Sequence, residues 1–175
     1  MQFAKDSFYV ALSERLTQIN PARTVAINGI SRSAIIVSEN EVINAAPSLE
    51  NAFLITWGAA EVCGGFEGAT QPLLKLECSI LYGTSGSRDD ASDRGRTITE
   101  LDSELLQMCS PPCAEKCDYT NSETIALNSR IFWTPPQITS LVANSDMDKV
   151  SAMTKQDAPV FHAAKLTVFF YPEVT

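Results

Sequence analysis

The spacing of hydrophobic residues near the start of the chain predicts an amphipathic helix over residues 6–19. Its apolar side chains recur every three or four positions, on one helical face: Phe8, Leu12, Leu16 and Ile19. Asp6 or Ser7 is placed to cap the start of this helix. The helix should end at Asn20, because the residue before Pro21 avoids the α conformation.

A turn signal divides the hydrophobic segment that follows. The run Thr24–Ile27 leads into Asn28-Gly29, a pair that favours a type I′ hairpin because both turn positions need positive φ. The returning strand would then begin at Ile30. The alternative is a longer hairpin, with residues 31–33 in the turn and residues 34–37 as the returning strand. The pattern leaves both registers open.

Alternation of apolar and polar residues is clearest over residues 73–82. One face of this predicted strand is apolar: Leu74, Leu76, Cys78, Ile80 and Tyr82. The other face is polar: Lys75, Glu77 and Ser79. One buried and one solvated face are typical of antiparallel sheets. Further β-forming runs predict strands at residues 53–57, which should stop at Gly58, and at residues 124–133 and 160–171.

A second helix is predicted over residues 96–109, again from apolar residues at helical spacing: Ile98, Leu101, Leu105 and Met108. Thr97 or Thr99 would cap it, and Pro111-Pro112 would stop it. The remaining segments read as polar or irregular: 38–51 with a helical turn at 48–51, 58–71, 83–95, 113–122, and the ambiguous stretch 138–153.

The order of these elements indicates the fold class. Helices do not alternate with strands, which favours an α+β fold with a mainly antiparallel sheet and two main helices packed on one face. We expect a single domain over residues 1–175, with loops at 83–95 and 109–122. A chain of this length can bury a core without help from a metal or a disulfide.

Charge restricts the partners of this protein. The net charge is −8 and the sequence pI is about 4.6, so duplex nucleic acid is not expected as a main partner. No run of apolar residues is long enough for a membrane helix. The first residues carry scattered charges rather than the basic end and apolar core of a secretory signal, which favours synthesis in the cytoplasm.

Three of the five cysteines form a Cys-x3-Cys-x3-Cys series: Cys109, Cys113 and Cys117. They could hold zinc, form a disulfide, or remain free thiols in a loop. Structural zinc sites usually use two separated pairs of ligands, and here the fourth ligand would be remote: Cys63, Cys78 or His162. The spacing therefore favours free thiols, and we predict no metal.

Other candidate motifs do not reach a reactive pattern. His162, the only histidine, has no nucleophile beside it, so a structural role is favoured over catalysis. The Asp89-Asp90 and Asp93 cluster fails the calcium-loop pattern, because its glycine falls at the seventh position rather than the sixth. The glycine segments 64–68 and 83–86 lack the features of phosphate loops and dinucleotide fingerprints. We therefore predict no catalytic, cofactor-binding or metal-binding residues and no enzyme activity.

Four segments together resemble one protein family. They are residues 16–21 at the end of the first helix, the strand 72–83, the polar loop and helix that end at Met108, and the terminal strand 165–171 followed by Pro172-Glu173. In this order they resemble the tail terminator, or tail completion, proteins of long-tailed phages and prophages. The segments 109–118 and 135–158 depart from that pattern.

The resemblance implies a structural virion protein. Its members form a hexameric ring that caps the tail tube and joins it to the head, so the implied partners are further copies of the chain, the tail-tube protein and head-completion proteins. Such a protein is made in the bacterial cytoplasm and then built into the virion. An acidic lumen would let DNA slide past, and the loop 84–95 would serve as a contact arm that orders on assembly.

Two other classes of function compete with this expectation. One is another phage connector, a minor tail component or a generic binding module. The other is a metalloprotein built around Cys109, Cys113, Cys117 and His162.

Overall fold

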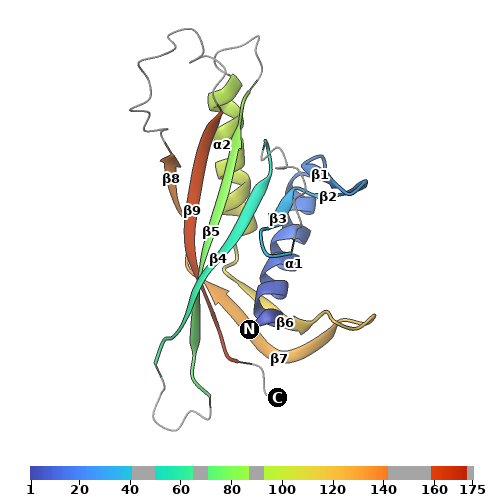
Figure 1. Ribbon diagram of the computed structural model, residues 1–175, viewed down its shortest axis with the longest axis vertical. Helices are drawn as coiled ribbons and strands as arrows, with labels where there is room; N and C mark the ends of the chain where they lie inside the picture. The colour runs from blue at the N-terminus through green and yellow to red at the C-terminus, as the bar shows by residue number, and fades with distance from the viewer. Residues whose placement is uncertain (41–49, 65–70, 87–92, 142–158, 173–175) are drawn as a thin grey trace.

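In the computed structural model of the chain, a curled and mostly antiparallel sheet carries two helices on one side (Figure 1). The structure describes residues 1–40, 50–64, 71–86, 93–141 and 159–172. Its elements are α1 (Gln2–Ile19), β1 (Thr24–Ile27), β2 (Ile30–Ser33), β3 (Ile35–Val37), β4 (Phe53–Val62), β5 (Leu74–Thr84), α2 (Asp93–Met108), β6 (Cys113–Asp118), β7 (Ile125–Trp133), β8 (Gln137–Leu141) and β9 (Val160–Phe170). The predicted α+β class is confirmed.

The main sheet has the strand order β3-β4-β5-β9-β7-β6, with β8 also paired to β9. All its pairs are antiparallel except β3 with β4. β5 occupies one edge of β9 along its whole length, whereas β8 and β7 share the other edge. β1 and β2 form a separate two-stranded sheet.

The core lies between the helices and the inner face of the sheet. The alternation predicted for β5 is confirmed, because its inner positions are at most 1% exposed: Leu76, Cys78, Ile80 and Tyr82. The ring of Phe8 on α1 packs edge-to-face against Trp57 of β4 and Trp133 of β7, at centroid distances of 5.5 and 5.1 Å. The apolar stripe predicted for α1 is therefore the surface that holds this helix on the sheet.

The start of α1 differs from the prediction. The helix begins at Gln2, so neither Asp6 nor Ser7 caps it. Ser7 is buried inside the helix, where its hydroxyl donates to the Phe3 carbonyl (2.6 Å) and accepts from the Cys117 amide of β6 (2.9 Å). A tertiary contact thus satisfies a side chain that would otherwise favour a helix end. The predicted end of the helix at Asn20 is confirmed.

The Asn28-Gly29 hairpin is confirmed. Ile27 pairs with Ile30, and Asn28 and Gly29 have φ values of 52° and 80°. The alternative longer hairpin is wrong, because Ile35–Val37 forms β3 and pairs in parallel with Phe53–Ile55.

The predicted stop at Gly58 is also wrong. β4 continues through this glycine to Val62, with an irregularity between Trp57 and Ala60. A Cβ atom at Gly58 would lie 3.0 Å from the Cβ of Glu77 on β5. The missing side chain therefore allows a close approach between paired strands and does not mark a turn.

The second helix starts earlier than predicted, at Asp93. Thr97 and Thr99 do not cap it, since their hydroxyls donate to the carbonyls of Asp93 (3.0 Å) and Gly95 (2.8 Å) within the helix. The helix ends at Met108, before Pro111-Pro112, as predicted.

Two irregular or ambiguous segments contain strands that were not predicted. Residues 113–118 form β6, because β7 supplies partners for their backbone groups. The ambiguous segment 138–153 contributes to β8 as far as Leu141. Three predicted segments lie partly or wholly outside the described residues: 142–153, residues 48–49 of the predicted turn, and residues 87–92 of the predicted contact arm 84–95.

A glycine at the β5–β9 contact gives a direct test of this pairing. A Cβ atom at Gly83 would lie 2.4 Å from Cδ1 of Phe161 and 2.6 Å from the carbonyl oxygen of Val160. Because that oxygen belongs to the backbone of β9, Gly83→Ala should lower the free energy of unfolding by about 1–3 kcal/mol, measured by urea denaturation. Gly95→Ala is the matched control, since its Cβ would meet nothing within 4 Å and it lies in a helix. Equal losses in the two variants would contradict the pairing.

Candidate functional site

The cysteine series does not form a single site. All five cysteines are free thiols. Cys109 follows the end of α2, and Cys113 and Cys117 lie on β6. The prediction that the series lies in a loop is therefore wrong. Among the described residues, no group of three or more His, Cys, Asp or Glu side chains is placed to hold a metal ion. The zinc alternative therefore finds no ligand set in this part of the chain.

Burial controls the reactivity of these thiols. Burial raises the pKa of the Cys109 thiol to about 12, although the nearby Arg15 partly opposes this effect. Burial also raises the pKa of Cys78 far above its usual range. The thiolate is the reactive form, so neither side chain is a nucleophile near neutral pH.

Thiol labelling tests this ranking. Cys63 is exposed, so a thiol reagent at pH 8 should modify it at once, whereas Cys78 and Cys109 should react only on unfolding. A raised pKa means that the thiolate forms only near or above that value, so a change from pH 7 to 9 should not bring Cys109 into the reaction. Cys63→Ser should remove the fast phase and Cys78→Ser should leave it. Cys113 is half-buried, so both proteins in this comparison carry Cys113→Ser. A fast phase that survives Cys63→Ser in that background would refute the ranking.

His162 has a carboxylate partner that the sequence did not reveal. His162 on β9 is in register with Tyr82 on β5, and α2 brings Asp102 to both. One oxygen of Asp102 lies 2.8 Å from Nδ1 of His162 and accepts the Tyr82 hydroxyl at 2.6 Å. The three residues come from separate elements, and no local pattern in the sequence joins them.

This cluster contains part of an acid–base arrangement. With the proton on Nδ1, a carboxylate at this position fixes the tautomer of the ring, as it does in hydrolytic triads. Among the described residues, however, no hydroxyl or thiol forms a hydrogen bond with the His162 ring. The Tyr82 hydroxyl donates to Asp102, its side chain is fully buried, and burial raises its pKa. The described part of this cluster therefore offers no nucleophile, and its hydrogen bonds join α2 to β5 and β9.

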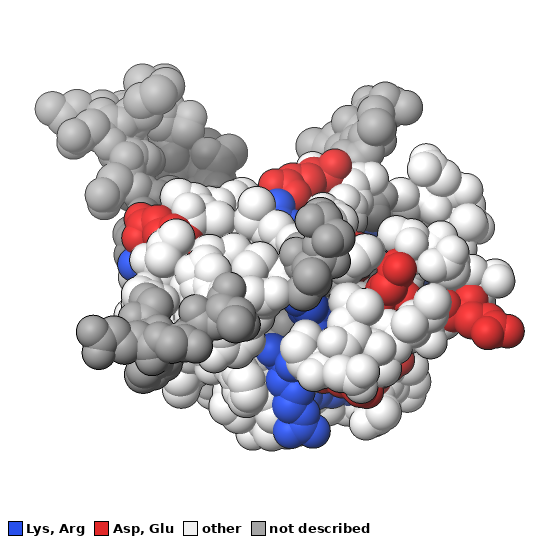
Figure 2. Space-filling view, turned by 90° about the horizontal axis from the view of Figure 1, so that it is seen from below, with Lys and Arg blue, Asp and Glu red and all other residues white. Residues whose placement is uncertain are grey.

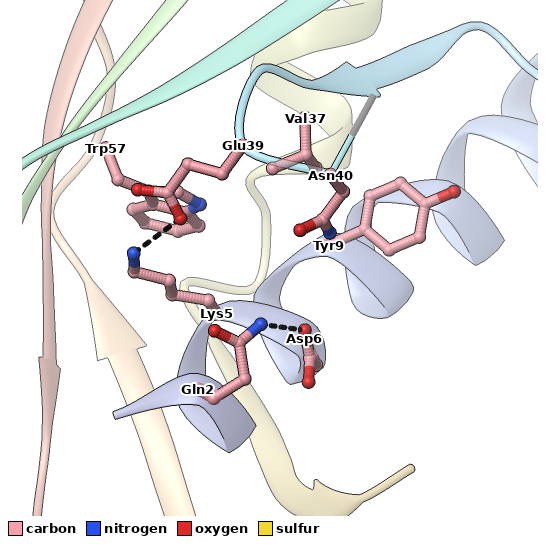
Figure 3. Close-up of a pocket in the computed structure, with 8 residues that line it drawn as sticks. All are labelled: Gln2, Lys5, Asp6, Tyr9, Val37, Glu39, Asn40 and Trp57. Carbon is pink, nitrogen blue, oxygen red and sulfur yellow. Dashed lines mark hydrogen bonds and ion pairs between the residues drawn. The ribbon is translucent and has the colours of Figure 1, made fainter. Parts of the chain in front are cut away.

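A small hollow lies between the first turns of α1 and the end of β3 (Figure 3). Figure 3 shows Lys5 extending across the Trp57 ring toward Glu39, with an Nζ–Oε2 distance of 2.7 Å. The side chains leave no room for a water molecule, and among the described residues the buried Nε1 of Trp57 has no hydrogen-bond partner. An ion pair closes this notch, so it is not a ligand cleft.

Several large apolar side chains are exposed at the ends of strands. They are Ile30 beside the β1–β2 turn, Val62 at the end of β4, Ile125 at the start of β7 and Leu141 at the end of β8. Figure 1 shows the β1–β2, β4–β5 and β6–β7 hairpins extending away from the helices and the core. Single exposed apolar residues are ordinary. Three of these four, Ile30, Val62 and Ile125, lie near the tips of the projecting hairpins, where they are accessible to another chain.

The face of the molecule seen in Figure 2 carries few charged side chains. Figure 2 shows a short group of Lys and Arg near its middle, with Asp and Glu around it and uncharged residues between them. The visible part of this face therefore has no extended basic surface for a phosphate backbone. In the described part of the chain, neither helix is long and apolar enough to cross a membrane.

We also compared the chain with protein families and with curated proteins. No protein-family model matches the chain, and no curated protein matches it.

Proposed function

We propose that this chain is a structural subunit of a phage or prophage tail, a tail terminator-like ring subunit that caps the tail tube and joins it to the head. One observation carries the proposal: exposed apolar side chains lie at the ends of projecting hairpins around an open sheet. Among the described residues, by contrast, no cluster combines a nucleophile with His162. Such a surface suits contacts between chains better than a reaction.

The segments that carry the family resemblance support this proposal. They fall on the end of α1, on β5, on α2 and on β9, which are the elements that enclose the core. A net charge of −8 suits a lumen past which DNA moves without binding. Head-to-tail contacts between copies close into a ring when the rotation between neighbours permits it.

The state of assembly tests the proposal. Light scattering coupled to size exclusion should give a mass that is a multiple of 19.0 kDa, and the protein should bind purified tail-tube protein in a pull-down. Monomer at every concentration, together with no binding to the tail-tube protein, would remove the support for this function.

A further inference from the structure

The face of the sheet opposite α1 and α2 carries charged and aromatic side chains in rows that cross neighbouring strands. We call it the outer face, and its positions follow from the strand registers. One row crosses four strands: Glu61 of β4, Lys75 of β5, Phe169 of β9 and Phe132 of β7. The inner neighbours Val168 and Trp133 are buried, whereas Phe132 is 49% exposed. An aromatic pair therefore lies on the open side of the sheet.

The outer face is close to balanced in charge, unlike the chain as a whole. Glu61 and Lys75 form an ion pair of 2.7 Å, and Glu115 of β6 is the register partner of Arg130 on β7. Glu77 and Lys165 occupy outward positions on β5 and β9. These positions are three acidic and three basic residues: Glu61, Glu77, Glu115, Lys75, Arg130 and Lys165. Glu50 bridges the outward position Gly83 and adds one acidic residue, so the sum is −1 in a chain of net charge −8.

A hollow of about 290 Å³ lies in this face where β9 changes its neighbour from β7 to β8. Pro135-Pro136 separates those two strands and supplies no backbone donors to the sheet. Two hydrogen bonds of 3.0 Å between Thr134 and Thr167 hold the edge of the gap. The lining is polar, with Glu77 and Lys165 among its residues. The hollow can receive a polar side chain from another chain.

We propose that the outer face is the surface through which the chain binds a second copy of itself. Two copies of net charge −8 repel when they approach through average surface. A face with nearly equal numbers of both signs removes most of that repulsion and allows opposite charges to pair across the contact. A nucleic acid would require an excess of basic residues, which this face lacks. The inference rests on the proposed function. Because a ring closes head to tail, the outer face is one side of the contact and meets a different surface of the next subunit.

Phe132 and Phe169 would form the centre of this contact. Aromatic side chains are enriched in interface cores and dominate their binding energy, while charged residues gather at the rim. The aromatic pair is flanked by Lys75 on β5 and by Arg130 on β7. This arrangement of an aromatic centre with a charged border matches the usual anatomy of an interface.

The test is Phe132→Asp in the full chain, measured by sedimentation equilibrium. Truncation at an interface hot spot costs about 2 kcal/mol or more, so self-association should weaken by at least about 30-fold. Leu106→Asp is the matched control, because Leu106 is 50% exposed but lies on α2. It should leave self-association unchanged. Circular dichroism confirms that both variants fold.

A charge exchange provides a second test that does not touch the aromatic pair. Lys165→Glu alone should weaken self-association and increase its dependence on salt, because it makes the face acidic. Adding Glu77→Lys to that variant restores the balance and should recover part of the loss. Equal weakening by the single and double variants would overturn the proposed charge pairing.

The outcomes separate this inference from the proposed function. If Leu106→Asp dissociates the oligomer and Phe132→Asp does not, the outer face is not the contact, although the assembly role stands. If the wild-type chain is monomeric but binds tail-tube protein through Phe132, the face serves a different partner and self-docking is refuted. If it neither self-associates nor binds the tube, both proposals fail.

Discussion

Replacing Arg15 with alanine should lower the free energy of unfolding by about 3–5 kcal/mol. The guanidinium of Arg15 on α1 donates to the carbonyls of Met108 (2.9 Å), Pro111 (2.8 Å) and Cys113 (2.8 Å), and it lies 5.3 Å from the centre of the Trp133 ring. Hydrogen bonds to charged groups contribute about 1.5–3 kcal/mol each and are not additive. One side chain therefore fastens the link between α2 and β6.

Urea denaturation would measure this loss. Arg15→Lys keeps the charge but not the planar set of donors, so it should recover only part of the stability. Arg130→Ala, on the exposed side of β7, should change stability by no more than about 0.5 kcal/mol. If Arg15→Ala and Arg130→Ala cost the same, Arg15 does not fasten this link.

Replacing Glu104 with alanine should have a comparable effect, with a loss of about 3–5 kcal/mol. Both oxygens of this α2 carboxylate accept from Arg23, at 2.9 Å each, and one also accepts from the amide of Asn20 at 2.7 Å. The side chains of Arg23 and Glu104 are only 12% and 9% exposed. Removing the carboxylate leaves the Arg23 charge buried without its partner, which costs more than the pair itself contributes.

A double variant distinguishes loss of the pair from exposure of an unpaired charge. Arg23→Met combined with Glu104→Met removes both charges and keeps apolar volume, so thermal denaturation should show it to be more stable than Glu104→Ala. If the double variant is as unstable as the single one, packing around Glu104 and not the buried charge is responsible for the loss.

Local sequence patterns predicted much of the secondary structure and its buried faces. The four-and-three spacing of Phe8, Leu12 and Leu16 and the alternation along β5 each mark a buried face, because side-chain direction follows directly from the period of the backbone. The Asn28-Gly29 turn was equally predictable, since few residues adopt positive φ at low cost. These features depend only on neighbours along the chain.

Element boundaries were less predictable. Gly58 and Ser7 carry strong local preferences, for a break and for a helix cap, and in both cases a contact with a distant strand prevails. β6 lies in a segment of weak strand propensity and forms because β7 pairs with it. Propensities of about 1 kcal/mol or less per residue are outweighed by such contacts.

The Asp102–His162 contact and the composition of the outer face could not be predicted from local sequence patterns either. Asp102 reaches His162 across 60 positions of sequence, and the outer row of Glu61, Lys75 and Phe169 exists only through the registers of three strands. The charges of these residues are visible in the sequence, but their balance on one face is not. The proposed self-contact therefore depends on information that the registers supply.

By itself, the sequence determined the α+β class, both helices, the presence of a first hairpin but not its register, and the strands with clear alternation. Only the tertiary structure decided the parallel pairing of β3, the sharing of β9 between β7 and β8, and the positions of His162 and the outer charges. The physical reason is one of range: helical period and turn geometry are set within a few residues, whereas strand order and register are chosen by packing between segments far apart in the chain.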